Sequence, residues 1–182
     1  MKYRIFDLRS MISKWDEGKI KSLLSSFKCS LNPDAEDFLI KSSIKHEKRD
    51  ISRTYLVVQD NSSERGYNLA GYFTLAVKCF SVGDEHIISS SVLESLNVNR
   101  GVAQSYLLGQ VAKADGVEKG LGRKMMDRAL LAFSEGNMMF GCRTIRLDCE
   151  NEPRLVEYYQ SCGFISIGKN HDNALNQMVA IM

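Results

Sequence analysis

The chain has 182 residues, of which 44% are hydrophobic and 25% are charged, and its formal net charge at pH 7 is +2. This length suits one well-buried domain, and the composition excludes disordered, fibrous and membrane-embedded proteins. The total charge is far from that of a strongly basic nucleic-acid binder, although a local basic patch stays open.

Cysteine and histidine usage indicates a cytoplasmic protein without a metal site. The five cysteines are an odd number with no CxxC pair, which predicts reduced thiols. The three histidines lie far apart and lack the spacing of metal ligands. No long apolar run follows residues 1–4, so we expect neither a signal peptide nor a membrane-spanning segment.

The N-terminal third predicts one strand followed by helices. Residues 3–8 lean towards an apolar strand. Between residues 20 and 27, apolar side chains recur at the spacing of one helix face. Asn32 and Pro33 then supply an N-cap and a first-turn proline for another helix, which we expect to end in the charged run 45–50.

A hairpin and a short helix are predicted next. Residues 54–58 and 69–80 have the composition of strands, and the polar segment 61–66 between them predicts an antiparallel hairpin. Ser91 and Glu94 have the spacing of a capping box, so we expect Ser91 to cap a short helix.

The C-terminal half alternates strands with helices, which predicts a mixed sheet. Strands are expected at 106–112, 144–149, 164–167 and 177–181, and helices from residue 121 to about 134 and from Pro153 to Gly163. Within the strand 144–149 the odd-numbered positions are apolar and point to one face, while Arg146 and Asp148 point to the other.

A glycine turn precedes the long helix of this half. Gly120 and Gly122 flank Leu121, and glycine lets the backbone approach a ligand closely. The free N–H groups of the next helical turn form an anion site that suits a pyrophosphate, with Lys119 and Arg123 nearby to add charge. The spacing fits neither a Rossmann turn nor a P-loop, and an ordinary glycine-containing loop is an equally good interpretation.

One tyrosine is a candidate acid. Tyr159 lies four residues before Gly163, the expected end of its helix. A phenol with a pKa near 10 is protonated at neutral pH and can donate its proton. The alternative is a structural ring that packs against its neighbours, and we expect that role for Tyr158.

The segment 106–164 resembles the GNAT acetyltransferases, which use acetyl-coenzyme A. Residues 107–112 look like the central strand of that family, residues 117–122 look like its diphosphate loop, and residues 159–164 look like its Tyr-x-x-x-Gly-Phe element. The resemblance implies a single GNAT domain of mixed α/β class over residues 1–182. Its mostly antiparallel, twisted sheet would contain two parallel neighbours that splay apart.

The same resemblance implies a mechanism and a set of site residues. The pantetheine arm of acetyl-CoA would lie between the splayed strands, and the backbone N–H of Val111 would polarise the thioester carbonyl. An amine would attack directly, and Tyr159 would protonate the departing sulfur. The implied cofactor-binding residues are Val111, Ala112, Lys113, Lys119, Gly120, Leu121, Gly122, Arg123 and Asn151.

The N-terminal half narrows the resemblance further. The order of residues 27–29, a helix at Phe38 and Leu39, and the strands 52–58 and 71–76 is similar to that of the GNAT toxins of bacterial toxin–antitoxin pairs. This similarity implies the amino group of aminoacyl-tRNA as the acceptor. It also implies a small ribbon-helix-helix antitoxin as a partner, and a homodimer.

Two positions depart from the family pattern. Val117 stands where the family prefers Arg or Gln, and Glu118 stands where glycine is usual. A carboxylate beside a diphosphate is electrostatically unfavourable. A catalytically weak acyl-CoA-binding module is therefore an alternative of another class.

The predicted strand 106–113 carries no carboxylate to act as a general base. An α-amino group, with a pKa near 7.7–8.0, is partly neutral at physiological pH and needs less help than a lysine amine near 10.4. This favours aminoacyl-tRNA as acceptor, with a small amine or a protein amine as the alternative. The polar cluster 84–86 is expected to be solvated.

Two groups of basic residues are candidates for an RNA-binding surface. One lies within residues 41–53 and the other within residues 113–128. Both are interspersed with acidic residues, so solvated helix faces are an equally good interpretation.

Overall fold

The computed structural model describes residues 3–60, 67–83, 88–170 and 173–182. The chain falls into two compact units. Unit 1 comprises residues 1–76 and 110–129, and unit 2 comprises residues 77–109 and 130–182. The prediction of one domain over the whole chain stays a prediction.

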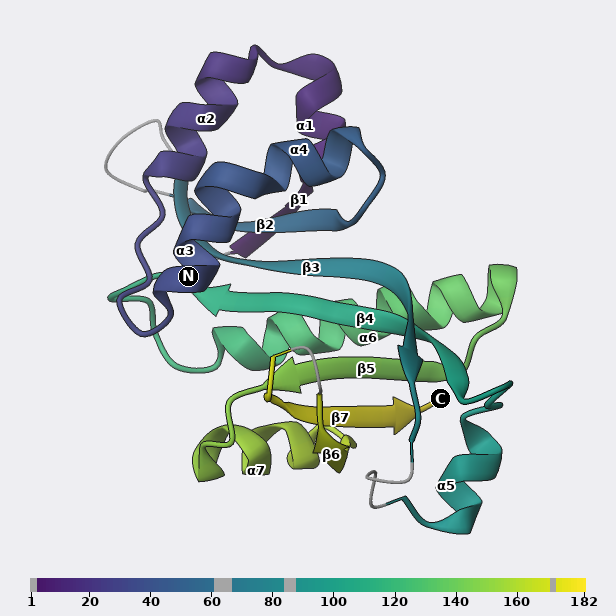
Figure 1. The fold of residues 1–182 in the computed structure, drawn as a ribbon. Coiled ribbons are helices and arrows are strands. Elements are labelled where there is room, and N and C mark those ends of the chain that lie inside the picture. Colours follow the sequence, from purple (N-terminus) through teal and green to yellow (C-terminus); the bar gives the residue numbers. More distant parts are fainter. Residues whose placement is uncertain (1–2, 61–66, 84–87, 171–172) are drawn as a thin grey trace. The chain divides into compact units, whose positions relative to one another are not determined.

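Unit 1 contains the N-terminal helices and one part of the sheet (Figure 1). Its strands are β1 (Tyr3–Asp7), β2 (Arg53–Asp60), the first part of β3 (Tyr67–Ser81) and the last part of β4 (Val102–Lys113). Its helices are α1 (Leu8–Lys14), α2 (Glu17–Ser25), α3 (Pro33–Asp37), the π-helical turn η1 (Phe38–Ser42), α4 (Ser43–Lys48) and the first half of α6 (Leu121–Phe140).

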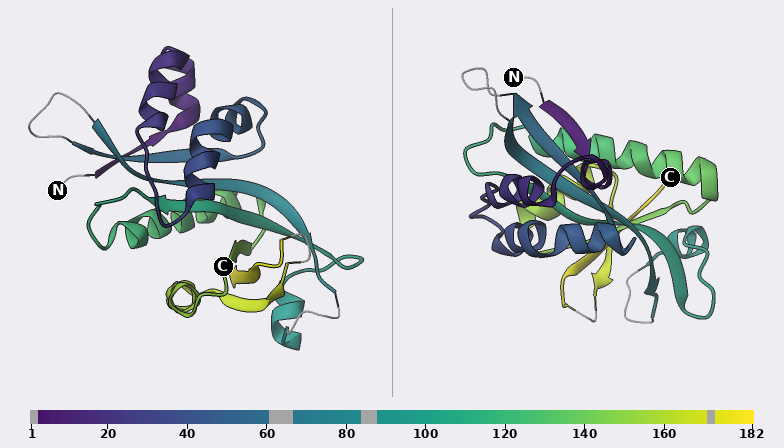
Figure 2. Two further views of the ribbon diagram at one scale, coloured as in Figure 1. Left: turned by 60° about the vertical axis from the view of Figure 1, so that its left-hand side comes forward. Right: turned by 90° about the horizontal axis from the view of Figure 1, so that it is seen from above.

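In unit 1, the N-terminal helices cover one face of β2 and β3, and the start of α6 covers the other (Figure 2). Tyr72 points to the first face, where its buried hydroxyl donates to the backbone oxygen of Ala35 at 2.6 Å. Gly71 points to the second face, where a Cβ would lie 2.8 Å from the backbone oxygen of Ala112. Glycine at this position therefore permits the close approach of β4 to β3.

Unit 2 contains the remaining parts of β3, β4 and α6 together with the C-terminal elements (Figure 1). These are α5 (Ser90–Ser95), β5 (Thr144–Cys149), α7 (Pro153–Ser161), β6 (Ile165–Lys169) and β7 (Asn176–Ile181). A small core of Phe80, Leu96, Ala103, Ile167 and Val179 joins β3 and α5 to the last two strands.

The strands follow the order β1-β2-β3-β4-β5-β7-β6 in one mixed sheet, as predicted. β1 with β2, β2 with β3, β5 with β7, and β6 with β7 pair antiparallel, and β4 with β5 pair parallel. The parallel register between the described residues of β4 and β5 covers two pairs, Tyr106 with Ile145 and Leu107 with Arg146. One parallel pair in an otherwise mostly antiparallel sheet confirms the predicted fold class.

Near the N-terminus, one element boundary differs from the prediction and one predicted helix cap is confirmed. The first strand ends at Asp7 rather than Leu8, because the Asp7 carboxylate accepts the Arg9 backbone N–H at 2.8 Å and starts α1, a helix that the sequence pattern did not reveal. The predicted N-cap of Asn32 is confirmed, since its side chain accepts from the backbone N–H of Ala35. The predicted turn 61–66 lies outside the described residues.

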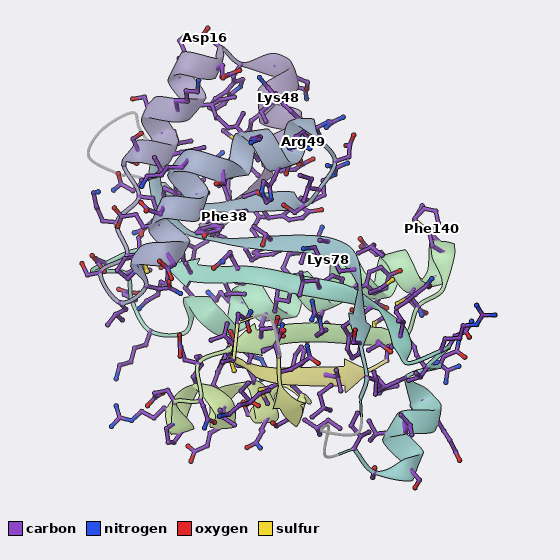
Figure 3. All side chains as sticks on the ribbon, viewed as in Figure 1. Asp16, Phe38, Lys48, Arg49, Lys78 and Phe140 are labelled. Carbon is purple, nitrogen blue, oxygen red and sulfur yellow. The ribbon has the colours of Figure 1, made fainter. Side chains whose placement is uncertain are left out.

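Two helix predictions in the second half were wrong in detail. The N-cap of α5 is Ser89, not Ser91, because successive serines offer the same capping hydroxyl and spacing alone does not choose between them. α6 continues past residue 134 to Phe140, where its last turn is exposed (Figure 3). The helix stops at Gly141, whose φ of +78° suits glycine and whose backbone oxygen accepts from the Tyr106 hydroxyl.

Among the described residues, no helix combines the length and apolar character that crossing a bilayer requires.

Candidate cofactor and catalytic site

The glycine turn lies in unit 1 at the N-terminus of α6. Gly120 has a φ of +94°, and a Cβ built there would meet no heavy atom of the described residues within 4 Å. Its carbonyl accepts the backbone N–H of Lys124, so Gly120 caps the helix, and Gly122 lies inside the first turn. Gly120 therefore leaves open space beside the N-terminus of a 20-residue helix, the end of a helix at which backbone N–H groups can bind a phosphate.

A lysine holds the loop before this turn. Lys113 Nζ donates to the backbone oxygen of Val117 at 2.6 Å and lies 3.5 Å from that of Glu118. The Glu118 side chain is exposed, so water screens its charge. Of the two cations predicted beside the turn, Arg123 donates to Asp127 Oδ1 at 2.9 Å, and Lys119 is exposed.

The end of β4 presents its backbone in unit 1. Ala112 is buried in the core, and its neighbour Val111 is half-buried. The backbone N–H of Gln110 donates to Thr74 Oγ1 of β3 at 2.8 Å, so a side chain replaces a backbone carbonyl at this point of the strand. Sequence reasoning missed this role of Thr74, because a hydroxyl inside a strand carries no signal of its partner.

Tyr159 lies in unit 2, and its place is set by the end of α7. The N–H of Gly163 donates to the Gln160 oxygen at 2.9 Å, and the N–H of Phe164 donates to the Tyr159 oxygen at 3.1 Å. With a φ of +91° at Gly163, these bonds make a Schellman cap. The cap brings Phe164 against the Tyr159 ring, with 6.1 Å between centroids. The Tyr-x-x-x-Gly-Phe spacing therefore has a structural cause.

The surroundings of Tyr159 keep its phenol protonated. Burial raises its pKa well above the usual range, and the thiol of Cys149 adds to this effect. The pKa of Cys149 is itself raised to about 11, chiefly by burial. A phenol in this state donates a proton and does not take one at neutral pH.

The predicted cofactor-binding residues are divided between the two units. Asn151 is exposed in unit 2, just before α7. The other predicted cofactor residues all belong to unit 1 and span β4, the loop and the first turn of α6. The polar cluster 84–86 lies outside the described residues.

Some basic residues of both groups form ion pairs. In the first group, Lys41 pairs with Asp37 and Lys48 pairs with Glu17, at 2.7 and 2.5 Å. Arg123 of the second group is paired as well.

Comparison of the structure with solved structures gives matches over nearly the whole chain. A tyrosine-to-phenylalanine variant of KacT matches with a TM-score of 0.73 and 19% identity, covering 97% of this chain and 94% of that one. AtaT complexed with acetyl-methionyl-tRNAfMet matches with a TM-score of 0.72 and 20% identity, covering 96% and 94%. The chain has the GNAT fold.

A further structure shows an AtaT mutant toxin bound to the C-terminus of the antitoxin AtaR and to acetyl-CoA. It matches with a TM-score of 0.70 and 18% identity, covering 100% of this chain and 94% of that one. A scan against models of known protein families finds no match, and a search of curated proteins by sequence finds none either. The predicted resemblance to GNAT toxins is thus confirmed at the level of the fold.

Proposed function

We propose that this chain is an acetyl-CoA-dependent N-acetyltransferase that acts on the α-amino group of aminoacyl-tRNA. The observation that carries the proposal is the match along nearly the whole chain to AtaT in complex with an acetylated aminoacyl-tRNA. The open helix N-terminus at Gly120 and the protonated Tyr159 phenol supply the two chemical groups that such a reaction needs.

The residues of unit 1 fit the phosphate end of the cofactor. The backbone N–H groups from Leu121 to Arg123 would bind the diphosphate, and Lys119 would add charge at the rim. The Val111 backbone N–H would donate to the acetyl carbonyl and stabilise the charge that develops there. When bound, acetyl-CoA supplies an acetyl group activated as a thioester.

Tyr159 would donate its proton to the departing sulfur. Because burial holds the phenol in its acid form, the proton is available at the pH where an α-amino group is partly neutral. Residues 106–113 contain no carboxylate that could act as a general base, and an α-amino acceptor does not need one. We propose these roles for Tyr159 and Val111, and a role in cofactor binding for the other predicted residues, including Asn151.

The partner and assembly state extend the proposal. Structures of similar fold include AtaT with part of its antitoxin AtaR and a KacTA–DNA complex. We therefore propose that a small antitoxin silences this chain. Its ribbon-helix-helix class, a homodimer and a cytoplasmic location remain predictions from the sequence.

Replacing Tyr159 by phenylalanine tests the catalytic role. We expect turnover to fall about 100-fold or more, because a positioned general acid contributes that much, while acetyl-CoA affinity stays unchanged since the ring packing survives. Mass spectrometry of charged tRNA after incubation with acetyl-CoA measures the product, and calorimetry measures affinity. Tyr158→Phe is the matched control and should retain activity.

The outcomes separate the three functions. Equal turnover of Tyr159→Phe and wild type would make the phenol structural. Acetylation of a small amine or peptide with charged tRNA left unmodified would move the acceptor to another class. Normal acetyl-CoA affinity without any turnover would leave an acyl-CoA-binding module.

Replacing Gly120 by glutamate tests the cofactor site. We expect acetyl-CoA affinity to fall at least about tenfold, because the change adds bulk and negative charge where the diphosphate would bind. Gly141→Glu is the matched control, since that glycine also has a positive φ and open space, at the other end of α6. Equal affinities in the two variants would remove the diphosphate assignment.

A further inference from the structure

Unit 2 contains a polar cavity of about 450 Å³ that none of the predicted site residues lines. Its walls come from the end of β3, from β4, β5 and β7, and from Asn170 and Asn173 between β6 and β7. Lys78 of β3 is exposed at this cavity (Figure 3). The lining mixes cationic, anionic and amide groups, so the cavity is suited to a polar ligand rather than an apolar one.

Arg146 is the buried cation of this cavity. Its residue is only 7% exposed, and its guanidinium carbon lies 5.4 Å from the ring centre of Phe80. Its Nη1 lies 3.7 Å from Asp148 Oδ2, which is a long ion pair. Its Nε is buried and has no hydrogen-bond partner among the described residues. A buried N–H of a charged group without an acceptor is costly, so the arrangement calls for an acceptor from outside the chain.

Asp148 is held in place by amides on the other side. Its Oδ2 accepts from Asn170 Nδ2 at 2.8 Å, and its Oδ1 lies 3.4 Å from Gln177 Nε2. The carboxylate is therefore fixed by two side chains and does not turn to satisfy the Arg146 Nε. The unpartnered donor is the Nε–H of Arg146, so the ligand that would complete the site is one that carries a hydrogen-bond acceptor.

Two residues of the cavity lining connect it to the strands of the candidate site. Leu107 and Arg146 form a parallel pair of β4 with β5. Under the proposed function these are the two strands that would hold the pantetheine arm. Cys149, three residues after Arg146 on β5, also lies close enough to Tyr159 in unit 2 to raise its pKa.

We propose that this cavity receives the amino-acid side chain of the acceptor, and that Arg146 selects side chains carrying a hydrogen-bond-accepting oxygen. This inference rests on the proposed function and names its substrate class. An aliphatic side chain would cover Arg146 and Asp148 without supplying a partner, whereas an amide, hydroxyl or carboxylate oxygen would satisfy Nε. Sites built around a buried polar group reject ligands that lack its partner more strongly than apolar pockets reject an extra methyl group.

A panel of purified aminoacyl-tRNAs tests the selectivity. With wild-type protein and acetyl-CoA, we expect kcat/KM for asparaginyl-, glutaminyl-, aspartyl- and threonyl-tRNA to exceed that for valyl- and leucyl-tRNA at least about tenfold. Arg146→Lys keeps the positive charge beside Asp148 but removes Nε, so most of the preference should disappear. Arg143→Lys makes the same exchange at an exposed arginine three residues earlier, and this variant should keep the preference for polar aminoacyl-tRNAs.

A binding measurement provides a readout that does not need tRNA. Asparaginamide and leucinamide imitate the aminoacyl end and can be titrated calorimetrically into wild type and both variants. We expect asparaginamide to bind more tightly than leucinamide to wild type and to Arg143→Lys, with the difference lost in Arg146→Lys. If a thermal melt shows that Arg146→Lys does not fold, the wild-type kcat/KM values for polar and aliphatic aminoacyl-tRNAs still test the selectivity.

The outcomes distinguish this inference from the function beneath it. Acetylation of aliphatic aminoacyl-tRNAs as fast as polar ones would overturn the selectivity and leave the acetyltransferase in place. A preference that survives in Arg146→Lys would remove the role of Arg146. Failure to acetylate any aminoacyl-tRNA would overturn the acceptor class and, with it, this inference.

Discussion

Glu47 in unit 1 and Arg146 in unit 2 are both buried charged side chains, but their surroundings differ. Glu47 is fully buried, and its two oxygens accept from the Thr54 backbone N–H and from Arg53 Nη1. Burial raises the pKa of Glu47, and the Thr54 and Arg53 bonds oppose that rise. Arg146 has a long contact to Asp148 and an Nε without a partner.

The comparison teaches that burial of a charge is not by itself the mark of a binding site. Each carboxylate oxygen of Glu47 accepts a hydrogen bond from the chain. These bonds join α4 to β2, so the cluster is structural and does not call for a ligand. Arg146 lines a cavity, and its buried Nε has no partner among the described residues. The unsatisfied atom together with the cavity distinguishes the second cluster.

Removing Glu47 should give the largest loss of stability. Glu47→Ala leaves the Thr54 N–H buried without an acceptor and leaves a void, so we expect the free energy of unfolding to fall by about 3 kcal/mol. Urea denaturation measures the change. Asp37→Ala, which removes an exposed helix pair with Lys41, is the control and should change little. A loss as small as the control's would mean that the Glu47 cluster is not structural.

Removing Arg146 should cost less. Arg146→Met keeps the length of the side chain, and Asp148 keeps its contacts to Asn170 and Gln177, so we expect a loss of about 1 kcal/mol or none. The same urea titration compares it with Glu47→Ala. If the two variants lose equal stability, Arg146 is as structural as Glu47 and the contrast between the clusters disappears.

Glu17 is an exposed carboxylate, and its removal should have the smallest effect on stability of the three substitutions. Contacts with Lys21 and Lys48 lower the pKa of Glu17 to about 2. Because the folded-state pKa is depressed, the stabilisation is present above the unfolded-state pKa and is lost as pH falls towards 2. Thermal midpoints between pH 2 and pH 7 should therefore fall less steeply on acidification in Glu17→Gln than in wild type. At pH 7, where the stabilisation is present, Glu17→Gln should melt slightly below wild type, and the two midpoints should converge towards pH 2. Parallel profiles would contradict the assignment.

Much of the fold follows from local patterns in the sequence. Alternating apolar positions predict β5 with its observed bounds, and the Asn32 cap and the Gly163 stop predict helix ends that the structure has. The Gly120 turn and the spacing of Tyr159 to Gly163 also follow, because caps and positive φ angles depend on a few neighbouring residues.

The errors share a different cause. The choice of Ser89 over Ser91, the extension of α6 to Phe140 and the start of α1 at Leu8 each depend on competing local options. Such options are decided by what packs against the segment, which a single stretch of sequence does not contain.

The amino-acid order alone determined most of the elements, the place of the glycine turn before α6 and the position of Tyr159 near the end of α7. The period of a strand also placed Arg146 and Asp148 on one face of β5. Only the tertiary structure decided that Arg146 is buried and that amides from distant segments hold Asp148. It also decided that Arg146 lines a cavity and has an Nε without a partner among the described residues. Periodicity reports the direction of a side chain, whereas its partners come from segments tens of residues away along the chain.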